Sequence, residues 1–598
     1  MPNQPTAPRR APGTGTVHDL VARHCYGTRA DATALVHRSR RVSYRELGEM
    51  TARVAAGLRR SGVREGEFVG VRMPRTPEAV AAMLGIMSAG AAYVPIDPAD
   101  PPERTRHVIA TAAIEVVLTA QNPLPAGDLV TAPPPARDPA APAYAIFTSG
   151  STGAPKGAVM PHSALVNLLR WHERARPDSG RLRTAQLCSL SFDFSFHEIF
   201  STLCGGGTLV LADDETRRNP FALAAFLRAA RIERIFAPVT LLEQLAGAVE
   251  REPVELLLRE VVTTGERLRI TKPMRDFFRR VPARLHNHYG ATEFQDATTW
   301  TLSGDPDRWP ALPPIGRPVD GVRVHVVDDD LAEVETGVVG ELCVAGAGLA
   351  QGYLRQPELT AGRFVANPFA PGRLYRTGDL ARRRPDGVLE HLGRRDTQIK
   401  AHGVRVEAGE IEALLLQHPR IGAAAVLAQE IAGQQRLVAH IVADAGLDTG
   451  AAPRMLDAFL APSLPRHMRP ELYAFRSAMP LTASGKTDRA RLRAADGEWL
   501  ALLGPDLHAA VAPDEYGGRQ VLVSSQVRRS LARILGEPPQ PDTDLFSAGL
   551  DSVSVILLRQ ALGKTLGYEL QQEDVFRNPT ENALTAHIVN MLENGGER

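Results

Sequence analysis

Hydrophobic and polar positions alternate along the first two thirds of the chain with two different periods. Short runs rich in β-branched residues, such as "RIFAPVT" at 234–240 and "RVHVVDD" at 323–329, predict buried strands. Ala/Leu/Arg-rich segments between them, such as "PFALAAFLRAAR" at 220–231, predict amphipathic helices. This alternation over residues 17–395 predicts a large α/β domain.

One uncharged stretch, "AVAAMLGIMSAGAAYVPI" at 79–96, has the composition of a membrane segment but not its length. A spanning helix needs about 20 apolar residues, and this one is interrupted by Gly85, Gly90 and Pro95. We therefore predict a buried helix that turns into a strand at "AAYVPI".

The pattern changes after residue 395. Strand-like and amphipathic pieces recur at shorter spacing over 396–498, which predicts a small α+β domain. A Gly/Pro/Asp-bearing stretch at 499–519 predicts a linker, and helical periodicity over 520–595 predicts an all-α four-helix bundle. Residues 1–16 have no apolar core and predict a disordered leader rather than a secretory signal.

Charge and cysteine content narrow the class of partner. Lys and Arg total 69 and Asp and Glu total 68, so no global positive field favours nucleic acid or an anionic membrane. The four cysteines are scattered without a C-x-x-C pair, which indicates neither a disulfide framework nor a zinc site. We expect a cytoplasmic protein with small-molecule and protein partners.

A Gly/Ser/Thr-rich loop, "FTSGSTGAPKG" at 147–157, carries the first chemical signal. Glycines let backbone N–H groups approach an anion, hydroxyls add donors, and Lys156 adds charge. The loop is not a Walker A motif, because Pro155 precedes the lysine and Gly157 follows it. It predicts a polyphosphate site of another kind.

The order of motifs resembles the adenylate-forming enzyme superfamily, and within it the adenylation domains of nonribosomal peptide synthetases. The motifs that carry this resemblance are "VSYREL" (42–47), "SAGAAYVPID" (88–97), the 147–157 loop, "FDFSFHEIF" (192–200), "NHYGATE" (287–293), "GELCVAGAGLAQGYL" (340–354), "YRTGDL" (375–380), "GRRDTQIKAHGVRVEAGEIE" (393–412) and "PLTASGKTDR" (480–489). The segment "DLFSAGLDSVSVILLRQAL" (544–562) resembles a phosphopantetheine carrier protein.

The resemblance implies a reaction between ATP and an amino acid that yields an aminoacyl adenylate and pyrophosphate. The phosphate loop would hold the departing phosphates through Thr148, Ser149, Gly150, Ser151, Thr152, Gly153 and Lys156. Glu293 would hold Mg²⁺, Tyr289 would lie against the adenine, and Asp379 and Arg394 would contact the ribose. Lys486 would bridge the substrate carboxylate and the α-phosphate, so that catalysis rests on Lys486, Glu293 and Thr148.

The resemblance also implies a second half-reaction. The small domain would rotate about Asp396, which removes Lys486 and brings the loop around His402 and Gly403 to the active site. The acyl group would pass to 4'-phosphopantetheine on Ser552, at the start of a carrier helix.

The substrate pocket follows from the same motifs. Asp193 would pair with the α-ammonium group, which argues against fatty or aryl acids. The remaining pocket positions are Phe194, His197, Phe236, Val262, Thr264, His288, Asp296 and Ala297. Two histidines, a threonine and an aspartate would face an aromatic side. We expect a polar or basic L-α-amino acid; Phe236, Val262 and His288 also resemble proline-type pockets.

Two other functions stay open at this point. An acyl-CoA-type ligase is disfavoured by Asp193 and the fused carrier segment, and an idle carrier scaffold by Lys486, Asp379 and Glu293. The sequence has neither an H-H-x-x-x-D-G run nor a G-x-S-x-G elbow. We therefore expect separate tailoring or condensation enzymes as partners, together with a phosphopantetheinyl transferase and, where one is needed, a small activator protein.

Overall fold

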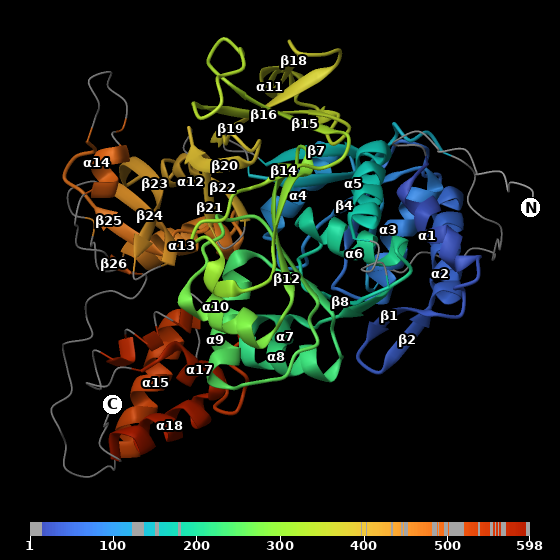
Figure 1. Ribbon diagram of the computed structural model, residues 1–598. Helices are drawn as coiled ribbons and strands as arrows, with labels where there is room; N and C mark the ends of the chain where they lie inside the picture. Colours follow the sequence, from blue (N-terminus) through green and yellow to red (C-terminus); the bar gives the residue numbers. More distant parts are fainter. Residues whose placement is uncertain are drawn as a thin grey trace, which may run out of the picture.

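The computed structural model forms a large N-terminal domain, a small domain beside it and a C-terminal helical body (Figure 1). It describes residues 15–121, 137–149, 155–176, 181–395, 398–401, 404–431, 434–443, 447, 452–480, 487, 489–494, 500–501, 519–535, 539–550, 554–555, 558–559, 561–563 and 570–593. The predicted leader and linker lie mostly outside these residues.

The first sheet of the large domain is built mainly from parallel strands. Within the described residues its order is β17-β7-β6-β4-β3-β5, with β7 and β17 antiparallel to their neighbours. The strands are β3 (Phe68–Arg72), β4 (Ala92–Pro95), β5 (Val117–Thr119), β6 (Pro142–Thr148), β7 (Lys156–Pro161) and β17 (Gly352–Tyr353).

The uncharged stretch forms α3 (Pro77–Ala89) followed by β4, as the sequence predicts. Thr76 caps the helix by accepting a hydrogen bond from Ala79 N, and Pro77 takes the first turn, where its missing N–H costs nothing. Gly90 ends the helix with a φ of 92°, a left-handed conformation that suits glycine. All thirteen helical residues but Glu78 are buried, so the stretch is a core helix.

The second sheet positions the site described below. Its order is β14-β13-β12-β11-β10-β8-β9-β1-β2, and β12, β11, β10, β8 and β9 are parallel. The strands are β1 (Thr33–His37), β2 (Arg40–Ser43), β8 (Arg183–Gln186), β9 (Thr208–Leu211), β10 (Arg234–Phe236), β11 (Glu260–Thr263), β12 (Arg284–Ala291), β13 (Gln295–Leu302) and β14 (Arg317–Pro318).

A third, antiparallel sheet of the large domain follows in sequence. It consists of β15 (Val322–Val327), β16 (Val339–Gly346), β18 (Phe364–Ala366), β19 (Arg373–Arg383) and β20 (Leu389–Arg394). The helices of the large domain are α1 (Val17–Cys25), α2 (Tyr44–Arg60), α3, α4 (Pro102–Ala112), α5 (His162–Ala175), α6 (Phe194–Cys204), α7 (Asp214–Arg218), α8 (Pro220–Ala229), α9 (Val239–Arg251), α10 (Lys272–Arg280), η1 (Pro306–Arg308) and α11 (Pro357–Arg363).

The small domain and the helical body each have a core of their own. The small domain contains β21 (Gln398–Ala401), β22 (Val404–Glu407), α12 (Ala408–Leu415), β23 (Ile421–Ile431), β24 (Gln434–Ala443), α13 (Ala452–Leu460), η2 (Arg466–Met468), β25 (Leu472–Phe475), α14 (Arg489–Ala494) and β26 (Leu500–Ala501). The helical body contains α15 (Arg519–Leu535), α17 (Gln572–Arg577) and α18 (Glu581–Glu593).

Specific contacts join the three parts. Glu407 N donates to Ser149 Oγ at 3.0 Å, which sets the β21–β22 hairpin beside the end of the phosphate loop. On the other side, α17 lies against α8 and α9, as Figure 1 shows. Two ion pairs of opposite polarity cross this contact, Arg251 with Glu573 at 2.8 Å and Glu252 with Arg577 at 3.2 Å.

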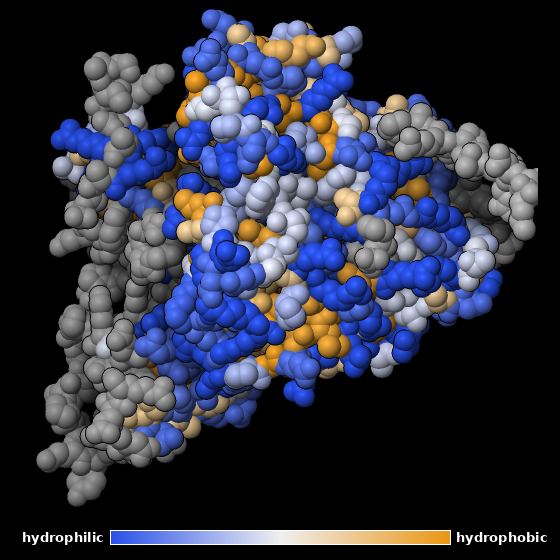
Figure 2. All heavy atoms as spheres, viewed as in Figure 1, coloured by the Kyte–Doolittle hydropathy of each residue, from blue (hydrophilic) through white to orange (hydrophobic). Residues whose placement is uncertain are grey.

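The viewed face of the molecule is mostly hydrophilic, with apolar residues in separate patches (Figure 2). None of the helices in the described ranges is long and apolar enough to cross a membrane.

Candidate active site

A cavity lies where the parallel strands β8, β10, β11 and β12 reach their carboxyl ends. This edge is the usual binding crevice of an open α/β sheet. The lining residues are Phe192, Asp193, Phe194, Thr264, Gly265, Gly290, Ala291, Thr292, Phe294, Gln295, Asp296, Tyr375, Thr377, Asp379 and Arg394. Predicted pocket residues and predicted nucleotide residues therefore share one cavity.

Asp193 stands at the amino end of α6 and points its charge into this cavity. Its carboxylate accepts hydrogen bonds from the Thr292 side chain and from the backbone N–H of Phe194. Burial raises the pKa of Asp193 to about 6, with Asp296 and Glu293 adding repulsion and a hydrogen bond from Thr292 opposing the rise. Within the described part of the chain no cationic side chain pairs with Asp193.

An apolar wall forms one side of the pocket. Phe194 and Phe236 meet edge to face with ring centroids 5.2 Å apart, and Val262 packs with them in a small buried cluster. Phe236, at the end of β10, also lies 5.2 Å from the His197 ring. The predicted position from "RIFAPVT" thus falls in the pocket region.

The polar side chains of the pocket region form two layers. Asp296 and Thr264 line the cavity, whereas His197 and His288 stand behind Asp296. His197 Nδ1 lies 2.6 Å and His288 Nδ1 3.0 Å from the same oxygen, Asp296 Oδ2. Thr264 Oγ1 donates to the His288 carbonyl at 2.9 Å. The last predicted pocket residue, Ala297, is fully buried in β13.

The two histidines and Asp296 are also a geometric candidate for a metal site. Their ligand atoms all lie within 4.8 Å of one another, and all three side chains are buried. The Nδ1 atoms of both histidines already lie within hydrogen-bond distance of Asp296 Oδ2.

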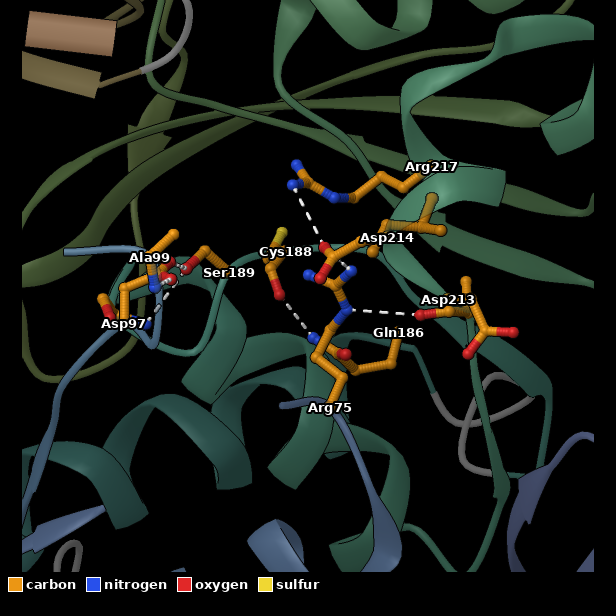
Figure 3. A network of polar contacts seen from close by, with 12 residues as sticks. Arg75, Asp97, Ala99, Gln186, Cys188, Ser189, Asp213, Asp214 and Arg217 are labelled. Atoms are coloured by element: carbon orange, nitrogen blue, oxygen red, sulfur yellow. Dashed lines mark hydrogen bonds and ion pairs between the residues drawn. The ribbon is translucent and has the colours of Figure 1, made fainter. Parts of the chain in front are cut away.

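The loop between β8 and α6, which carries Asp193, is held by a polar network (Figure 3). Ser189 Oγ donates to Asp97 Oδ2 at 3.1 Å, and Gln186 Nε2 donates to the Cys188 carbonyl at 2.6 Å. Nearby, Arg75 pairs with Asp214 and donates to the Ala212 carbonyl. The loop is therefore tied to the segment after β4 and placed beside the segment after β9.

Glu198, fully buried on α6, holds the start of the same loop through hydrogen bonds. Its oxygens accept from Leu187 N at 2.7 Å, from Cys188 N at 3.2 Å and from Gln186 Nε2 at 2.8 Å. Burial raises the pKa of Glu198 to about 8, and these three hydrogen bonds work against the rise. The helix that presents Asp193 thus also anchors the strand end before it.

Asp379, Tyr289 and Arg394 gather at the other end of the cavity. Tyr289 Oη donates to Asp379 Oδ2 at 2.5 Å, and Arg394 Nη1 donates to Asp379 Oδ1 at 2.6 Å. His391 Nε2 lies 3.3 Å from Asp379 Oδ1, a partner that sequence motifs did not indicate. Burial and the Asp379 charge raise the pKa of Tyr289 well above its usual range, so its hydroxyl stays a donor.

Lys156 and Glu293 form a buried pair between the two regions. Lys156 Nζ lies 3.2 Å from Glu293 Oε1, and Tyr353 Oη donates to the same oxygen at 2.7 Å. Thr148 Oγ1, at the end of β6, is buried without a hydrogen-bond partner among the described residues. A hydroxyl, an ammonium and a carboxylate are thus together, a donor set that fits a phosphate with its metal ion.

Several predicted residues lie outside the described residues: Gly150, Ser151, Thr152, Gly153, Asp396, Lys486 and Ser552. Conversely, sequence reasoning missed Tyr353, Arg176, His172 and Arg234. Tyr353 stands in the motif "AQGYL", which could have drawn attention to it. The other three reach the site only through tertiary packing.

Comparison with known protein families matches three consecutive stretches of the chain. Residues 21–354 match the AMP-binding enzyme family, 410–486 the AMP-binding enzyme C-terminal domain and 525–588 the phosphopantetheine attachment site. The chain belongs to the AMP-binding enzyme family. Together the matched stretches have the order of an adenylation domain followed by a phosphopantetheine carrier domain.

Curated relatives agree with this assignment. The chain is 34% identical over 597 residues to tyrocidine synthase 2 from Brevibacillus parabrevis, and 36% identical over 578 residues to a dimodular nonribosomal peptide synthase from Bacillus subtilis. These matches cover 96% and 92% of the chain but only 16% and 23% of the relatives. The chain therefore spans a small part of the length of these relatives.

Two solved structures have the same organisation. A holo nonribosomal peptide synthetase protein containing adenylation and PCP domains, bound to a vinylsulfonamide inhibitor, matches with a TM-score of 0.74, 25% identity and 96% coverage of both chains. The artificially fused adenylation-PCP di-domain NpsA-ThdA from Klebsiella oxytoca matches with a TM-score of 0.67 and 26% identity, over 77% of this chain and 94% of the other. The predicted multidomain fold is confirmed.

Proposed function

We propose that this AMP-binding ligase activates an L-α-amino acid with ATP as aminoacyl-AMP and passes the acyl group to its own carrier domain. The observation that carries the proposal is Asp193, a buried carboxylate in the cavity whose pKa is raised to about 6 and which has no cation partner among the described residues. An α-ammonium group would supply the missing charge.

The nucleotide would occupy the other end of the cavity. Asp379 and Arg394 offer an acceptor and donors to the ribose hydroxyls, and Tyr289 lies next to them. Thr148, whose hydroxyl has no hydrogen-bond partner among the described residues, would donate to a phosphate, and Lys156 would add charge there. We assign to Lys486, from the small domain, the stabilisation of charge that develops on the α-phosphate.

Two bound groups complete the proposal. Glu293 would hold Mg²⁺, which neutralises the charge of the phosphates when bound. Ser552 would carry 4'-phosphopantetheine, which supplies the thiol that accepts the acyl group; a phosphopantetheinyl transferase is then a required partner. The ion pairs of α17 with α9 support loading within one chain, because they hold the carrier domain against the large domain.

The pocket favours a polar or basic side chain. Asp296 lines the same cavity as Phe194 and Asp193 and offers a carboxylate to the substrate side chain. An ammonium, guanidinium or ring N–H of the substrate would donate to it.

Separate tailoring or condensation enzymes, and an activator protein if one is needed, would act in the cytoplasm. All four cysteines are free and buried, as suits a reducing compartment.

Amino-acid-dependent exchange of pyrophosphate into ATP, measured across a panel of acids, tests the activation step. We expect exchange with one or a few polar or basic amino acids and loss of at least about a hundredfold in Lys486→Ala. Exchange with fatty or aryl acids, or with aliphatic amino acids only, would contradict the proposed substrate. Proline-driven exchange would instead favour the proline-like alternative.

A further inference from the structure

Behind the pocket lies a second layer of buried side chains, two arginines and a histidine, that do not line the cavity. His172, in the last turn of α5, and Arg176, just after this helix, are 2% and 6% exposed, and Arg234 at the start of β10 is fully buried. These residues contact the two histidines that stand behind Asp296. The role inferred below for these contacts rests on the proposed function, in which this pocket receives the substrate side chain.

Arg176 determines where His288 carries its proton. Arg176 Nη2 lies 2.8 Å from His288 Nε2, and a guanidinium can only donate hydrogen bonds. His288 Nε2 is therefore the bare nitrogen of a neutral ring, and the proton is on Nδ1. That N–H points at Asp296 Oδ2, 3.0 Å away.

Arg234 determines which nitrogens of His172 and His197 carry their protons. Arg234 Nη1 donates to His172 Nε2 at 2.9 Å, so His172 carries its proton on Nδ1. This Nδ1 lies 2.8 Å from His197 Nε2, which must then accept, and the proton of His197 is left on Nδ1. His197 Nδ1 donates to Asp296 Oδ2 at 2.6 Å.

One contact competes with this assignment. Arg176 Nη1 lies 3.2 Å from His172 Nδ1, but a neutral ring cannot accept on both nitrogens. The Arg234 contact is shorter, and Arg234 is fixed by Thr184 Oγ1 and Thr202 Oγ1, each at 3.0 Å. His172 therefore accepts from Arg234 and donates to His197.

Both series of hydrogen bonds end on the Asp296 carboxylate, and they keep that carboxylate charged. Burial lowers the pKa of His197 to about 4 and also lowers that of His288, with Arg176 contributing to both, so the rings stay neutral. Burial would raise the pKa of Asp296, but the two histidine contacts outweigh it and hold it below its usual range. Protonated Nδ1 atoms cannot ligate a metal, so the cluster of His197, His288 and Asp296 is a hydrogen-bonded triad.

We propose that His172 and Arg176 are positioning residues for substrate selection, which direct the N–H groups of His197 and His288 at Asp296 and so commit the pocket to a cationic or N–H-donating side chain. Neither residue touches the substrate. Their effect reaches it through the orientation and charge of Asp296.

The direct test observes the tautomers. Long-range ¹⁵N–¹H correlation spectra of the full chain with ¹⁵N-histidine should show His197 and His288 as neutral Nδ1–H forms, assigned by His197→Gln and His288→Gln. In Arg176→Met the His288 signals should move toward the Nε2–H form or a mixture. Wild-type signals of an Nε2–H tautomer or an imidazolium at either residue would overturn the proposal, and this measurement needs no activity.

Kinetics provide the second test, with the amino acid that best supports exchange. We expect Arg176→Met to raise KM for that amino acid about tenfold or more, with KM for ATP within about twofold, and Arg176→Lys, which keeps a donor, to recover most of the loss. Arg174→Met is the matched control, because Arg174 is an exposed residue of α5 two positions before Arg176. An unchanged KM in Arg176→Met would overturn the proposal. If no amino acid supports exchange, the proposed function fails, and the spectra still decide whether His197 and His288 are Nδ1–H tautomers. If Arg176→Met does not fold, the wild-type spectra decide this alone.

Discussion

Asp193 is the residue on which the proposed amino-acid specificity depends. Asp193 lies in the cavity with a pKa raised by burial and without a cation partner among the described residues. We expect Asp193→Asn to lower kcat/KM for the amino acid at least about a hundredfold, because a buried ammonium without its counter-ion costs about 3 to 5 kcal/mol. Pyrophosphate exchange at varied amino-acid concentration measures this, with the exposed Asp330→Asn as control. A change below about fivefold would remove Asp193 from substrate binding.

The same carboxylate should impose a pH dependence. Its pKa of about 6 means that the charged form predominates above pH 6 and is lost below it. Since kcat/KM reports the free enzyme, kcat/KM for the amino acid should fall about tenfold per unit below pH 6. At saturating amino acid, where Asp193 is already paired, kcat/KM for ATP should lack this step. A flat amino-acid profile between about pH 5 and pH 7 would speak against the assignment.

Local sequence motifs predict some of the site residues and cannot predict others. Asp193 and Asp379 stand in motifs that carry the family resemblance and Asp296 follows such a motif, and the structure gathers all three in one cavity. His391, Arg176 and His172 carry no local signal. Arg176 meets His288 across 112 positions of sequence, so only the packing of α5 near β12 makes the contact.

Among the elements, α6 does two things at once. Its first residues form the pocket wall, and Glu198 further along holds the end of β8 and the loop before Asp193. Glu198→Gln would turn one acceptor oxygen into an amide that faces the donors, a cost of about 1 to 3 kcal/mol.

We therefore expect this variant to melt at lower temperature and to show a raised KM for the amino acid, with KM for ATP less affected. Calorimetry and exchange kinetics check both effects, and Glu173→Gln, a surface residue paired with Arg23, is the control. Equal increases in both KM values would show that Glu198 supports the whole domain rather than the Asp193 loop.

Element types were more predictable than element partners. The helix at 77–89 and the strand after it follow from an apolar run with Thr76 and Gly90 at the helix ends. The two-residue strands β14 and β17 have no such signature, because they exist only by pairing with β13 and β7. Sheet order likewise depends on contacts that no local pattern contains.

For the whole molecule, the position of the carrier domain is the part that the sequence could not predict. It rests on α17 against α8 and α9, where Arg251 meets Glu573 and Glu252 meets Arg577. Phe221 of α8 packs against the carrier core. Such pairs are individually weak at a surface, about 0.2 to 1 kcal/mol each, but like charges at both would repel.

We expect the double reversal Arg251→Glu with Glu252→Arg to slow carrier loading several-fold while pyrophosphate exchange stays unchanged. The matching reversal Glu573→Arg with Arg577→Glu should have the same effect, and the chain with all four changes should recover. Loading rates from quenched-flow mass spectrometry measure this. If neither reversal slows loading, this contact does not serve transfer.

We propose that this chain activates an amino acid and loads it on its own carrier domain. Intact mass spectrometry of the phosphopantetheinylated protein, incubated with ATP, Mg²⁺ and the amino acid selected by exchange, tests it most directly. We expect a mass gain equal to one aminoacyl group, lost on treatment with hydroxylamine, absent without ATP and in Ser552→Ala, and much slower to appear in Asp193→Asn. No gain on the wild-type protein, or an undiminished gain on Ser552→Ala, would contradict it.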